Sequence, residues 1–314
     1  MSFENIIGHE NIKAQVIRSI ENSKFAHAHL LVGEDGIGKS ILAENMAMKI
    51  LGKVREIDYP DIVKWKVPKN RKSIGVEQVR ELTEEINRKP YEGDKKVIIV
   101  YEAHKMTIQA QNAFLKTIEE PPKGVFIILL CENLEVLLDT IKSRCQIHKL
   151  KSLTEEEIYK YLKRKYNNLS EDKIKSVIAF SNGIPGRAEK FLDDKIFNEI
   201  RDKTIDIFTN ITKVNELKAL EYDSFFLEFK ESWEEILNCM LVYIRDAMIY
   251  KETSNKELII NKDKYKEIEE ITRIFSFKKL NDIIDIIKEA IDSLNKNVNL
   301  ALVFDVMLLK IQEV

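Results

Sequence analysis

The chain has 314 residues, with 50 Lys and Arg against 52 Asp and Glu, and a formal net charge of −2. An apolar share of 44% beside 32% charged residues is enough to form buried cores, which excludes disorder as the overall state. Neither half of the sequence is a polycation, so we do not expect tight nucleic-acid binding by the chain alone, which needs a concentrated basic face.

The first 150 residues alternate short apolar segments with amphipathic ones. Strands are predicted at 29–32, 97–100 and 125–130, because these segments lack the polar alternation of half-exposed strands. Helices are predicted at 40–51, 76–89 and 107–120, the last ending before Pro121 and Pro122. This order of strands and helices predicts an α/β domain with a parallel sheet.

After residue 150 the sequence predicts helices alone. Residues 151–195 indicate a few short helices, the first beginning at the capping box Thr154-Glu-Glu-Glu157. No Gly or Pro follows Gly186, and apolar residues recur at the three- and four-residue steps of helical cores, as in Phe225, Phe229, Trp233, Ile236, Met240, Ile244 and Met248. We predict three domains: an α/β domain at 1–150, a small helical lid at 151–195 and an all-helical domain at 200–314.

Several sequence features indicate a cytoplasmic protein. The first residues show no basic segment followed by an apolar one, so no signal peptide is expected. The longest apolar run, 125–131, is far shorter than the roughly 20 residues of a membrane-spanning helix, so no membrane partner is expected. Cys131, Cys145 and Cys239 lie far apart, which excludes a disulfide framework and a CxxC zinc site.

A phosphate-binding motif follows the first predicted strand. The pattern G-x-x-x-x-G-K-[ST] is matched by Gly33-Glu-Asp-Gly-Ile-Gly-Lys-Ser40. Its glycines let backbone N–H groups face phosphate oxygens, and the dipole of the following helix favours the anion. The motif predicts that ATP or ADP is bound by Gly33, Gly36, Ile37, Gly38, Lys39, Ser40 and Ile41, with Ser40 as a Mg²⁺ ligand; a glycine-rich structural turn is the alternative.

The residues for hydrolysis are less complete. Hydrolysis also requires a carboxylate that anchors Mg²⁺ at the end of a neighbouring strand, and a group that orients water. The predicted strand at 97–100 is followed by Tyr101, where that carboxylate is expected, and by Glu102, a candidate for orienting water. A neutral phenol is a poor ligand for Mg²⁺, and Asp94 precedes the strand. The sequence therefore predicts nucleotide binding with weak or absent ATPase activity.

Taken together, these motifs resemble the clamp-loader branch of the AAA+ ATPases, over close to the full length. The most specific segments are Arg88-Lys-Pro-Tyr-Glu-Gly93 and Leu115-Lys-Thr-Ile-Glu-Glu-Pro-Pro122. Further segments of the resemblance are Phe3-Glu-Asn-Ile-Ile-Gly8, Glu102-Ala-His-Lys-Met106, Ser143-Arg-Cys145, Gly183-Ile-Pro-Gly-Arg-Ala188 and Asn297-Val-Asn-Leu-Ala-Leu302. The resemblance implies an AAA+ domain, a lid, and a C-terminal collar through which the subunits of a bacterial replicative clamp loader assemble.

The resemblance also implies roles for three further residues. Arg144 matches the arginine finger that such subunits present in trans to the ATP site of an adjacent subunit, where a guanidinium neutralises charge on the γ-phosphate. Arg187 matches the sensor-2 position, which contacts the subunit's own nucleotide, and Asn133 is the candidate for sensor 1. The alternative for both arginines is an exposed, solvated side chain.

The resemblance further implies partners and the absence of zinc. The implied partners are the motor ATPase subunits and the delta subunit of a clamp loader and, through the complex, the sliding clamp and primed DNA. Many relatives carry four zinc-binding cysteines after the phosphate-loop helix, whereas residues 52–58 contain neither Cys nor His, so no zinc is expected. A hydrolysis-competent clamp-loader ATPase is the alternative function, and a DNA-binding module acting alone is a third, disfavoured by the charge balance.

Two smaller features each allow two interpretations. Around Trp65 lie the basic residues Lys64, Lys66, Lys69, Arg71 and Lys72, for which a solvated loop or β-hairpin face is favoured over contact with DNA. His27 and His29 alternate along the strand that enters the phosphate loop. A packed or hydrogen-bonded role is favoured over metal binding for both, because no third ligand is near in the sequence.

Overall fold

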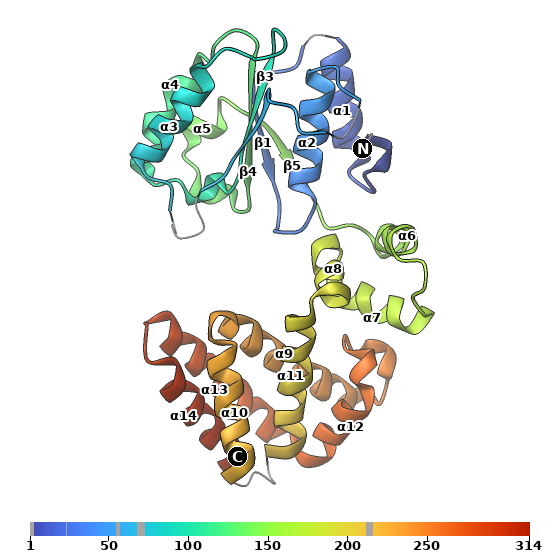
Figure 1. The fold of residues 1–314 in the computed structure, drawn as a ribbon. Coiled ribbons are helices and arrows are strands. Elements are labelled where there is room, and N and C mark those ends of the chain that lie inside the picture. Colours follow the sequence, from blue (N-terminus) through green and yellow to red (C-terminus); the bar gives the residue numbers. More distant parts are fainter. Residues whose placement is uncertain (1–2, 23, 55–56, 68–72, 212–215) are drawn as a thin grey trace. The chain divides into compact units, whose positions relative to one another are not determined.

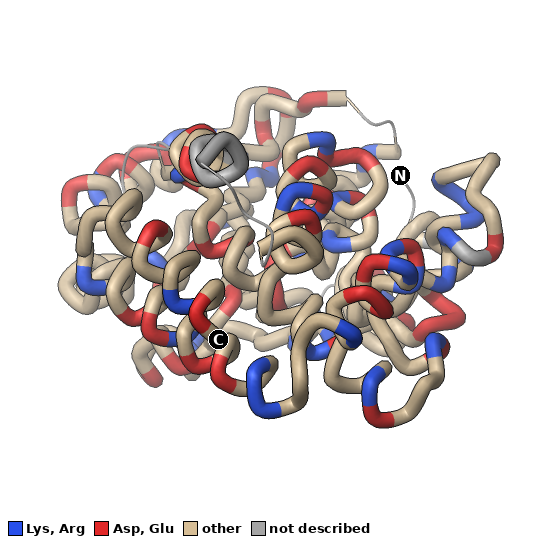
Figure 2. Tube along the Cα trace, turned by 90° about the horizontal axis from the view of Figure 1, so that it is seen from below, with Lys and Arg blue, Asp and Glu red and all other residues tan. Residues whose placement is uncertain are grey.

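Two compact units divide the computed structural model, which describes residues 3–22, 24–54, 57–67, 73–211 and 216–314. Unit 1 contains Met1–Lys165 and Asn182–Gly186, and unit 2 contains Tyr166–Ser181 and Arg187–Val314. Unit 1 holds the strands, and unit 2 is helical (Figure 1). Basic and acidic residues are interspersed along the described chain (Figure 2), in keeping with the expectation from composition.

Unit 1 is built on a five-stranded sheet with the strand order β2-β3-β4-β1-β5. All neighbouring strands are parallel, and the strands are β1 (Ala28–Val32), β2 (Ile62–Trp65), β3 (Lys96–Val100), β4 (Val125–Cys131) and β5 (Gln146–Lys149). The central strands β1, β3 and β4 contain the three predicted segments and differ from them by one residue at one end. The prediction of a parallel α/β domain is confirmed.

Helices cover both faces of this sheet (Figure 1). On one face lie α1 (Glu10–Glu21) and α2 (Lys39–Ile50), where Met46 of α2 is fully buried. On the other lie α3 (Val76–Asn87), α4 (Ile108–Glu119) and α5 (Asp139–Lys142), where Phe114 of α4 is fully buried. This three-layer arrangement buries both faces of the central strands and leaves their carboxyl ends free for the loops that form the site.

In the described part of unit 1, the remaining elements are one helix and three 3-10 turns. The turns are η1 (Phe3–Asn5), η2 (Ala103–Lys105) and η3 (Leu134–Val136). Helix α6 (Glu155–Lys165) begins at the predicted capping box. The backbone N–H of Thr154 donates to Oε2 of Glu157 over 2.8 Å, and the N–H of Glu157 donates to Oγ1 of Thr154 over 3.2 Å.

The two histidines before the phosphate loop are held by hydrogen bonds within unit 1. Nε2 of His27 lies 2.9 Å from the carbonyl oxygen of Ile118. His29 is fully buried in β1, with Nε2 at 2.9 Å from the carbonyl oxygen of Ala26 and Nδ1 at 3.0 Å from Nε2 of His148 in β5. The ring of Phe25 stacks on His29. The prediction of a hydrogen-bonded role for His27 and His29 is confirmed.

Unit 2 consists of helices joined by short connections. The elements are α7 (Glu171–Ser181), α8 (Pro185–Asp193), α9 (Lys195–Asn210), α10 (Glu216–Glu228), η5 (Lys230–Ser232), α11 (Trp233–Thr253), η6 (Lys256–Leu258), η7 (Lys262–Lys264), α12 (Tyr265–Ile274), α13 (Phe277–Asn295) and α14 (Leu300–Glu313). Asp194, Ser276 and Asn299 cap three of the helices, as a sequence without Gly and Pro requires. The all-helical prediction is confirmed, although the apolar stripe beginning at Phe225 is interrupted by η5.

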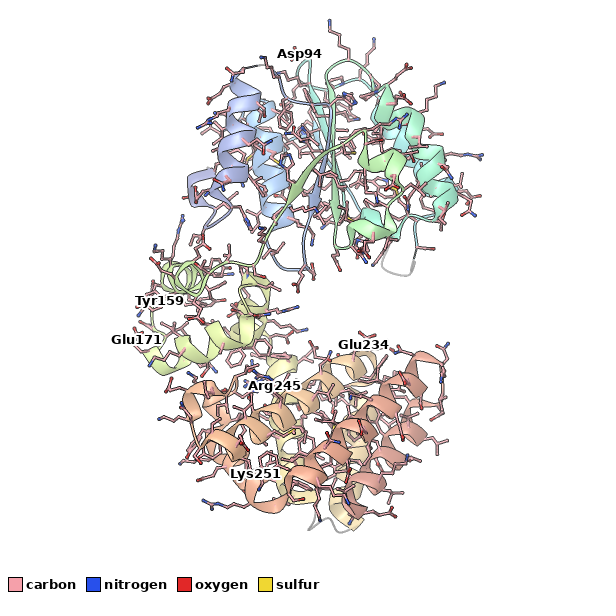
Figure 3. All side chains as sticks on the ribbon, turned by 180° about the vertical axis from the view of Figure 1, so that it is seen from behind. Asp94, Tyr159, Glu171, Glu234, Arg245 and Lys251 are labelled. Carbon is pink, nitrogen blue, oxygen red and sulfur yellow. The ribbon has the colours of Figure 1, made fainter. Side chains whose placement is uncertain are left out.

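A buried polar cluster joins α9, α11 and the segment that contains η7. The guanidinium of Arg201 donates to Oδ1 of Asn261 at 2.9 Å and to Oδ1 of Asp263 at 3.0 Å. The fully buried carboxylate of Asp246 accepts hydrogen bonds from the backbone N–H groups of Ile260 and Asn261. Its neighbour Arg245 lies on α11 (Figure 3) and donates to Asp246 over 3.1 Å. These pairs satisfy charges that would be costly to bury alone.

Among the described residues, none of the helices combines the length and the apolar character that a membrane crossing needs.

Candidate functional site

The predicted phosphate loop lies between the end of β1 and the start of α2, as the motif requires. Gly36 and Gly38 have φ angles of +78° and +105°, which L side chains rarely adopt. A Cβ on Gly38 would meet nothing within 4 Å, so glycine is required there by the backbone conformation and not by space. The backbone N–H of Gly33 donates to the carbonyl oxygen of Cys131 over 3.1 Å, which fixes the loop beside the end of β4.

Lys39 is folded back onto this loop. Its ammonium donates to the carbonyl oxygens of Gly33 and Glu34 over 2.7 and 2.8 Å. Burial lowers the pKa of Lys39, and the nearby carboxylates of Glu132 and Asp35 act in the opposite direction. The ammonium is therefore positioned over the loop and is free to exchange these carbonyls for phosphate oxygens, so the residues present fit a nucleotide.

The phosphate loop also contacts the backbone of Gly186. The N–H of Gly186 donates to the carbonyl oxygen of Gly36 over 2.9 Å. A Cβ built on Gly186 would lie 2.6 Å from the Cα of Gly36, closer than real Cβ atoms approach backbone. The contact between Gly36 and Gly186, both of which belong to unit 1, therefore depends on glycine at both positions.

We expect Gly186→Ala to destabilise unit 1 by about 1–3 kcal/mol, because either the loop or the start of α8 must shift. The measurement is urea unfolding followed by Trp65 fluorescence in a Trp233→Phe background, so that the signal comes from unit 1. The matched control is Gly93→Ala, because a Cβ there would meet nothing within 4 Å. Equal unfolding midpoints for the two alanine variants would contradict the close contact.

Tyr101 occupies the position next to Ser40 where a Mg²⁺-binding carboxylate was expected. The hydroxyl of Ser40 hydrogen-bonds to the phenol, and the phenol donates to Oε1 of Glu44 over 3.2 Å. Burial and the neighbouring Glu44 raise the pKa of Tyr101 to about 12, so the phenol stays neutral. The ammonium of Lys66 lies 4.3 Å from the centre of the Tyr101 ring. Ser40 therefore faces a neutral side chain.

These surroundings do not fit a tightly held Mg²⁺. Oε2 of Glu44 is paired with the ammonium of Lys64 over 3.2 Å, so this carboxylate already has two partners. Asp94 precedes the amino end of β3, so it lies at the opposite end of the strands from the phosphate loop (Figure 3). In the part of the chain that the structure describes, no group of three His, Cys, Asp or Glu side chains is arranged to hold a metal ion.

Glu102 and Asn133 have partners outside the phosphate loop. Glu102 lies next to Tyr101 with a φ of +52°, and its carboxylate pairs with the ammonium of Lys105. Asn133 is exposed, and its Oδ1 accepts a hydrogen bond from the backbone N–H of Glu135 over 2.9 Å. Both lie after strands whose carboxyl ends meet near the loop, but the structure shows neither side chain contacting it.

Arg144 lies at the surface of unit 1, in the turn between α5 and β5. Its guanidinium donates to the carbonyl oxygen of Thr140 over 3.0 Å and to Oε1 of Glu119 over 3.2 Å. The exposed fraction of the Arg144 side chain is 33%. Its Nε is buried and, among the described residues, makes no hydrogen bond. The guanidinium is thus held by two hydrogen bonds at the surface of unit 1.

The remaining predicted residues are distributed as follows. Ile37 is buried in the core, whereas Ile41 is 47% exposed on α2. Arg187 belongs to unit 2, in the first turn of α8, and is exposed. Of the predicted basic segment, Lys64 and Lys66 are paired with Glu44 and Tyr101 as given above, and Lys69, Arg71 and Lys72 lie outside the described residues.

Three residues at this site were not predicted from the sequence. Glu44 accepts the hydrogen bond of the Tyr101 hydroxyl, and the carboxylate of Glu132 acts to raise the pKa of Lys39. His9, with a φ of +57°, hydrogen-bonds to the backbone of Ile37. A signal existed for Glu132, since it directly follows the buried strand 125–131, but its proximity to the loop depends on β4 being the neighbour of β1.

Two family models match separate parts of this sequence. The model described as "DNA polymerase III, delta subunit" matches residues 8–154, and the one described as "DNA polymerase III, delta subunit, C terminal" matches residues 197–313. The chain belongs to the DNA polymerase III delta-subunit family. The resemblance to clamp-loader AAA+ proteins in the motifs is confirmed, and the relatives include subunits named delta', gamma and tau.

Individual relatives of this chain are also named as DNA polymerase III subunits. DNA polymerase III subunit delta' of Escherichia coli is 36% identical over 41% of this chain and 39% of its own length. Subunit delta' of Bacillus subtilis is 26% identical over 94% of this chain and 93% of its own length. Subunit gamma of Buchnera aphidicola is 30% identical over 58% of this chain and 55% of its own length, so the chain spans only about half of that relative.

Proposed function

We propose that this chain is the delta-prime subunit of a bacterial clamp loader, which binds ATP or ADP without efficient turnover and lends Arg144 to a neighbouring ATPase subunit. The observation that supports this most directly is the neutral Tyr101 against Ser40, beside an otherwise intact phosphate loop. Together with family membership, this arrangement favours a subunit that retains nucleotide binding over one that is a motor.

The chain's own residues would act on the nucleotide as follows. Backbone N–H groups of the loop after Gly33, whose own N–H is paired with Cys131, and the amino end of α2 would receive the phosphates, and Lys39 would move from loop carbonyls to phosphate oxygens. Mg²⁺, when it accompanies the nucleotide, has Ser40 as its protein ligand and is held weakly, because the neighbouring Tyr101 supplies no charge. Asn133 as sensor 1 and Arg187 as sensor 2 complete the proposed set.

Turnover by this chain would require a water-orienting group in addition to Mg²⁺. Glu102 is the candidate, and its ion pair with Lys105 would have to open for the carboxylate to reach a water molecule. Without a carboxylate at Tyr101 and with Glu102 engaged elsewhere, bound ATP is expected to persist. The nucleotide would then serve to stabilise the subunit's conformation.

The proposed partners and domain roles follow from the family. Residues 1–150 would bind nucleotide and contact a motor subunit, 151–195 would form the lid, and 200–314 would form the collar that assembles with the motor and delta subunits. The sliding clamp and primed DNA would be reached through the complex, in the cytoplasm. No zinc is part of the proposal.

The test is calorimetry of the purified chain with ATP and ADP, with and without Mg²⁺, beside a steady-state ATPase assay. We expect binding that changes less than about threefold on adding Mg²⁺, with negligible turnover. Lys39→Ala should weaken nucleotide binding at least ~tenfold, because it removes the phosphate-binding ammonium. The matched control is Lys49→Ala on the same helix, an exposed lysine paired with Glu21.

A second variant tests the role of Tyr101. Tyr101→Asp places a carboxylate beside Ser40, so Mg²⁺ should now strengthen ATP binding about tenfold or more. Tyr91→Asp, at a 70% exposed position of unit 1, adds the same charge elsewhere and should leave the Mg²⁺ dependence unchanged. Robust ATP turnover by the unmodified chain would instead favour the hydrolysis-competent ATPase.

A further inference from the structure

The acidic residue that directly follows β4, Glu132, contributes to the charge around the phosphate loop. Of the groups that raise the pKa of Lys39, the carboxylate of Glu132 acts most strongly, followed by Asp35. Asp35 belongs to the loop itself and is exposed, as is Glu34. Glu132 is exposed as well, but it does not belong to the loop, because it directly follows the carboxyl end of β4, the strand paired with β1.

The backbone fixes where Glu132 lies. It directly follows Cys131, which is paired with Val32 at the end of β1 and accepts the hydrogen bond of Gly33. The N–H of Glu132 donates to Nδ1 of His104 over 3.3 Å, and its Oε1 lies 3.9 Å from Nε2 of the same ring. Since His104 belongs to η2, which follows β3, Glu132 is held near the carboxyl ends of β3 and β4, beside the loop that follows β1.

A carboxylate in this place affects ATP and ADP differently. In a phosphate loop the lysine compensates the charge of the β- and γ-phosphates. Here the charge of Lys39 is already partly compensated by Glu132, so less of it remains for a third phosphate. ATP also brings one more negative charge than ADP toward Glu132, and like charges repel.

We propose that Glu132 makes this site selective for a nucleoside diphosphate over a triphosphate. The inference rests on the proposed nucleotide binding and adds to it which nucleotide is retained. A subunit that holds a diphosphate needs neither a Mg²⁺-binding carboxylate nor a water-orienting group, which agrees with the neutral Tyr101 and with the pairing of Glu102 with Lys105.

The test is the ratio of ATP to ADP dissociation constants, measured by calorimetry on the full chain in EDTA. The unmodified chain should bind ADP at least fivefold more tightly than ATP. Glu132→Gln keeps the size of the side chain and removes its charge, so it should strengthen ATP binding about tenfold and ADP binding less than about threefold. The matched control is Glu135→Gln, an exposed glutamate three residues along the chain, which should leave both constants unchanged.

A loop variant distinguishes selectivity from a general charge effect. Asp35→Asn removes a carboxylate within the loop and should change the ATP and ADP constants by the same factor. A ratio that stays within twofold in Glu132→Gln, while both nucleotides still bind, would overturn the role of Glu132 and leave the proposed nucleotide binding standing. Loss of all binding in the unmodified chain and in Glu132→Gln alike would overturn both.

Discussion

Replacing Arg144 by alanine is expected to lower the ATPase rate at the adjacent motor subunit's site about 10³-fold, when the clamp loader is reconstituted and stimulated by primed DNA. A guanidinium supplied in trans stabilises charge that develops on the γ-phosphate, and a neutral methyl group cannot. Among the described residues, Arg144 hydrogen-bonds to Thr140 and Glu119 at the surface, so its removal is expected to cost the fold little. Glu119→Gln, which frees the guanidinium from its ion pair, should preserve the ATPase rate.

Two further variants separate a finger from a general surface charge. Arg144→Lys keeps the charge but loses the planar donor fork, so it should restore little of the rate. Arg273→Ala is the matched control, because Arg273 is exposed on α12 and is paired with Glu269 at 3.2 Å, the distance that separates Arg144 from Glu119. Assembly of each complex is checked by size-exclusion chromatography. An Arg144→Ala loader that assembles and hydrolyses ATP at the unmodified rate would rule out the finger.

The sequence was sufficient to predict the strands that carry the loop and Tyr101, because each consists mainly of Leu and β-branched residues without polar alternation. It did not predict β2 and β5, since both are four residues long and mix apolar with charged side chains. Such strands lie at the edges of the sheet, where one side remains open, so their residues need not be uniformly apolar. Their pairing is determined by the neighbouring strand and not by a local pattern.

The residues of the candidate site also divide into those that a local pattern predicts and those whose position depends on the strand order. Gly36, Gly38 and Lys39 were predicted because the motif itself specifies their chemistry through local spacing. Glu44 and Glu132 were not, because their proximity to the site depends on which side of α2 faces β3 and on β4 lying beside β1. A residue that acts on a loop from another strand is identified only when the strand order is known.

Acidification is expected to destabilise unit 1 through the buried His29–His148 pair. Burial lowers the pKa of His29 to about 3 and that of His148 to about 4, whereas both are ordinarily 6.5. Below pH 6.5 the two histidines therefore bind protons in the unfolded chain but stay neutral in the folded one. The free energy of unfolding falls by about 1.4 kcal/mol per pH unit for each histidine. At pH 5 the two together should cost about 4 kcal/mol relative to pH 7.5, a large part of a domain's stability.

The neutral pair has a defined order of donors, which suggests a variant that removes one titrating ring. With Nε2 of His29 donating to Ala26, its Nδ1 must accept from Nε2 of His148. Gln at position 148 can supply the same donor, so His148→Gln should halve the slope of stability against pH between 6.5 and 5, measured by urea unfolding with Trp65 fluorescence in the Trp233→Phe background. Ile147→Val on the same strand lowers stability without removing a titrating group, so its slope should match that of the unmodified protein. If His148→Gln also kept the full slope, groups other than this pair would have to bind the protons.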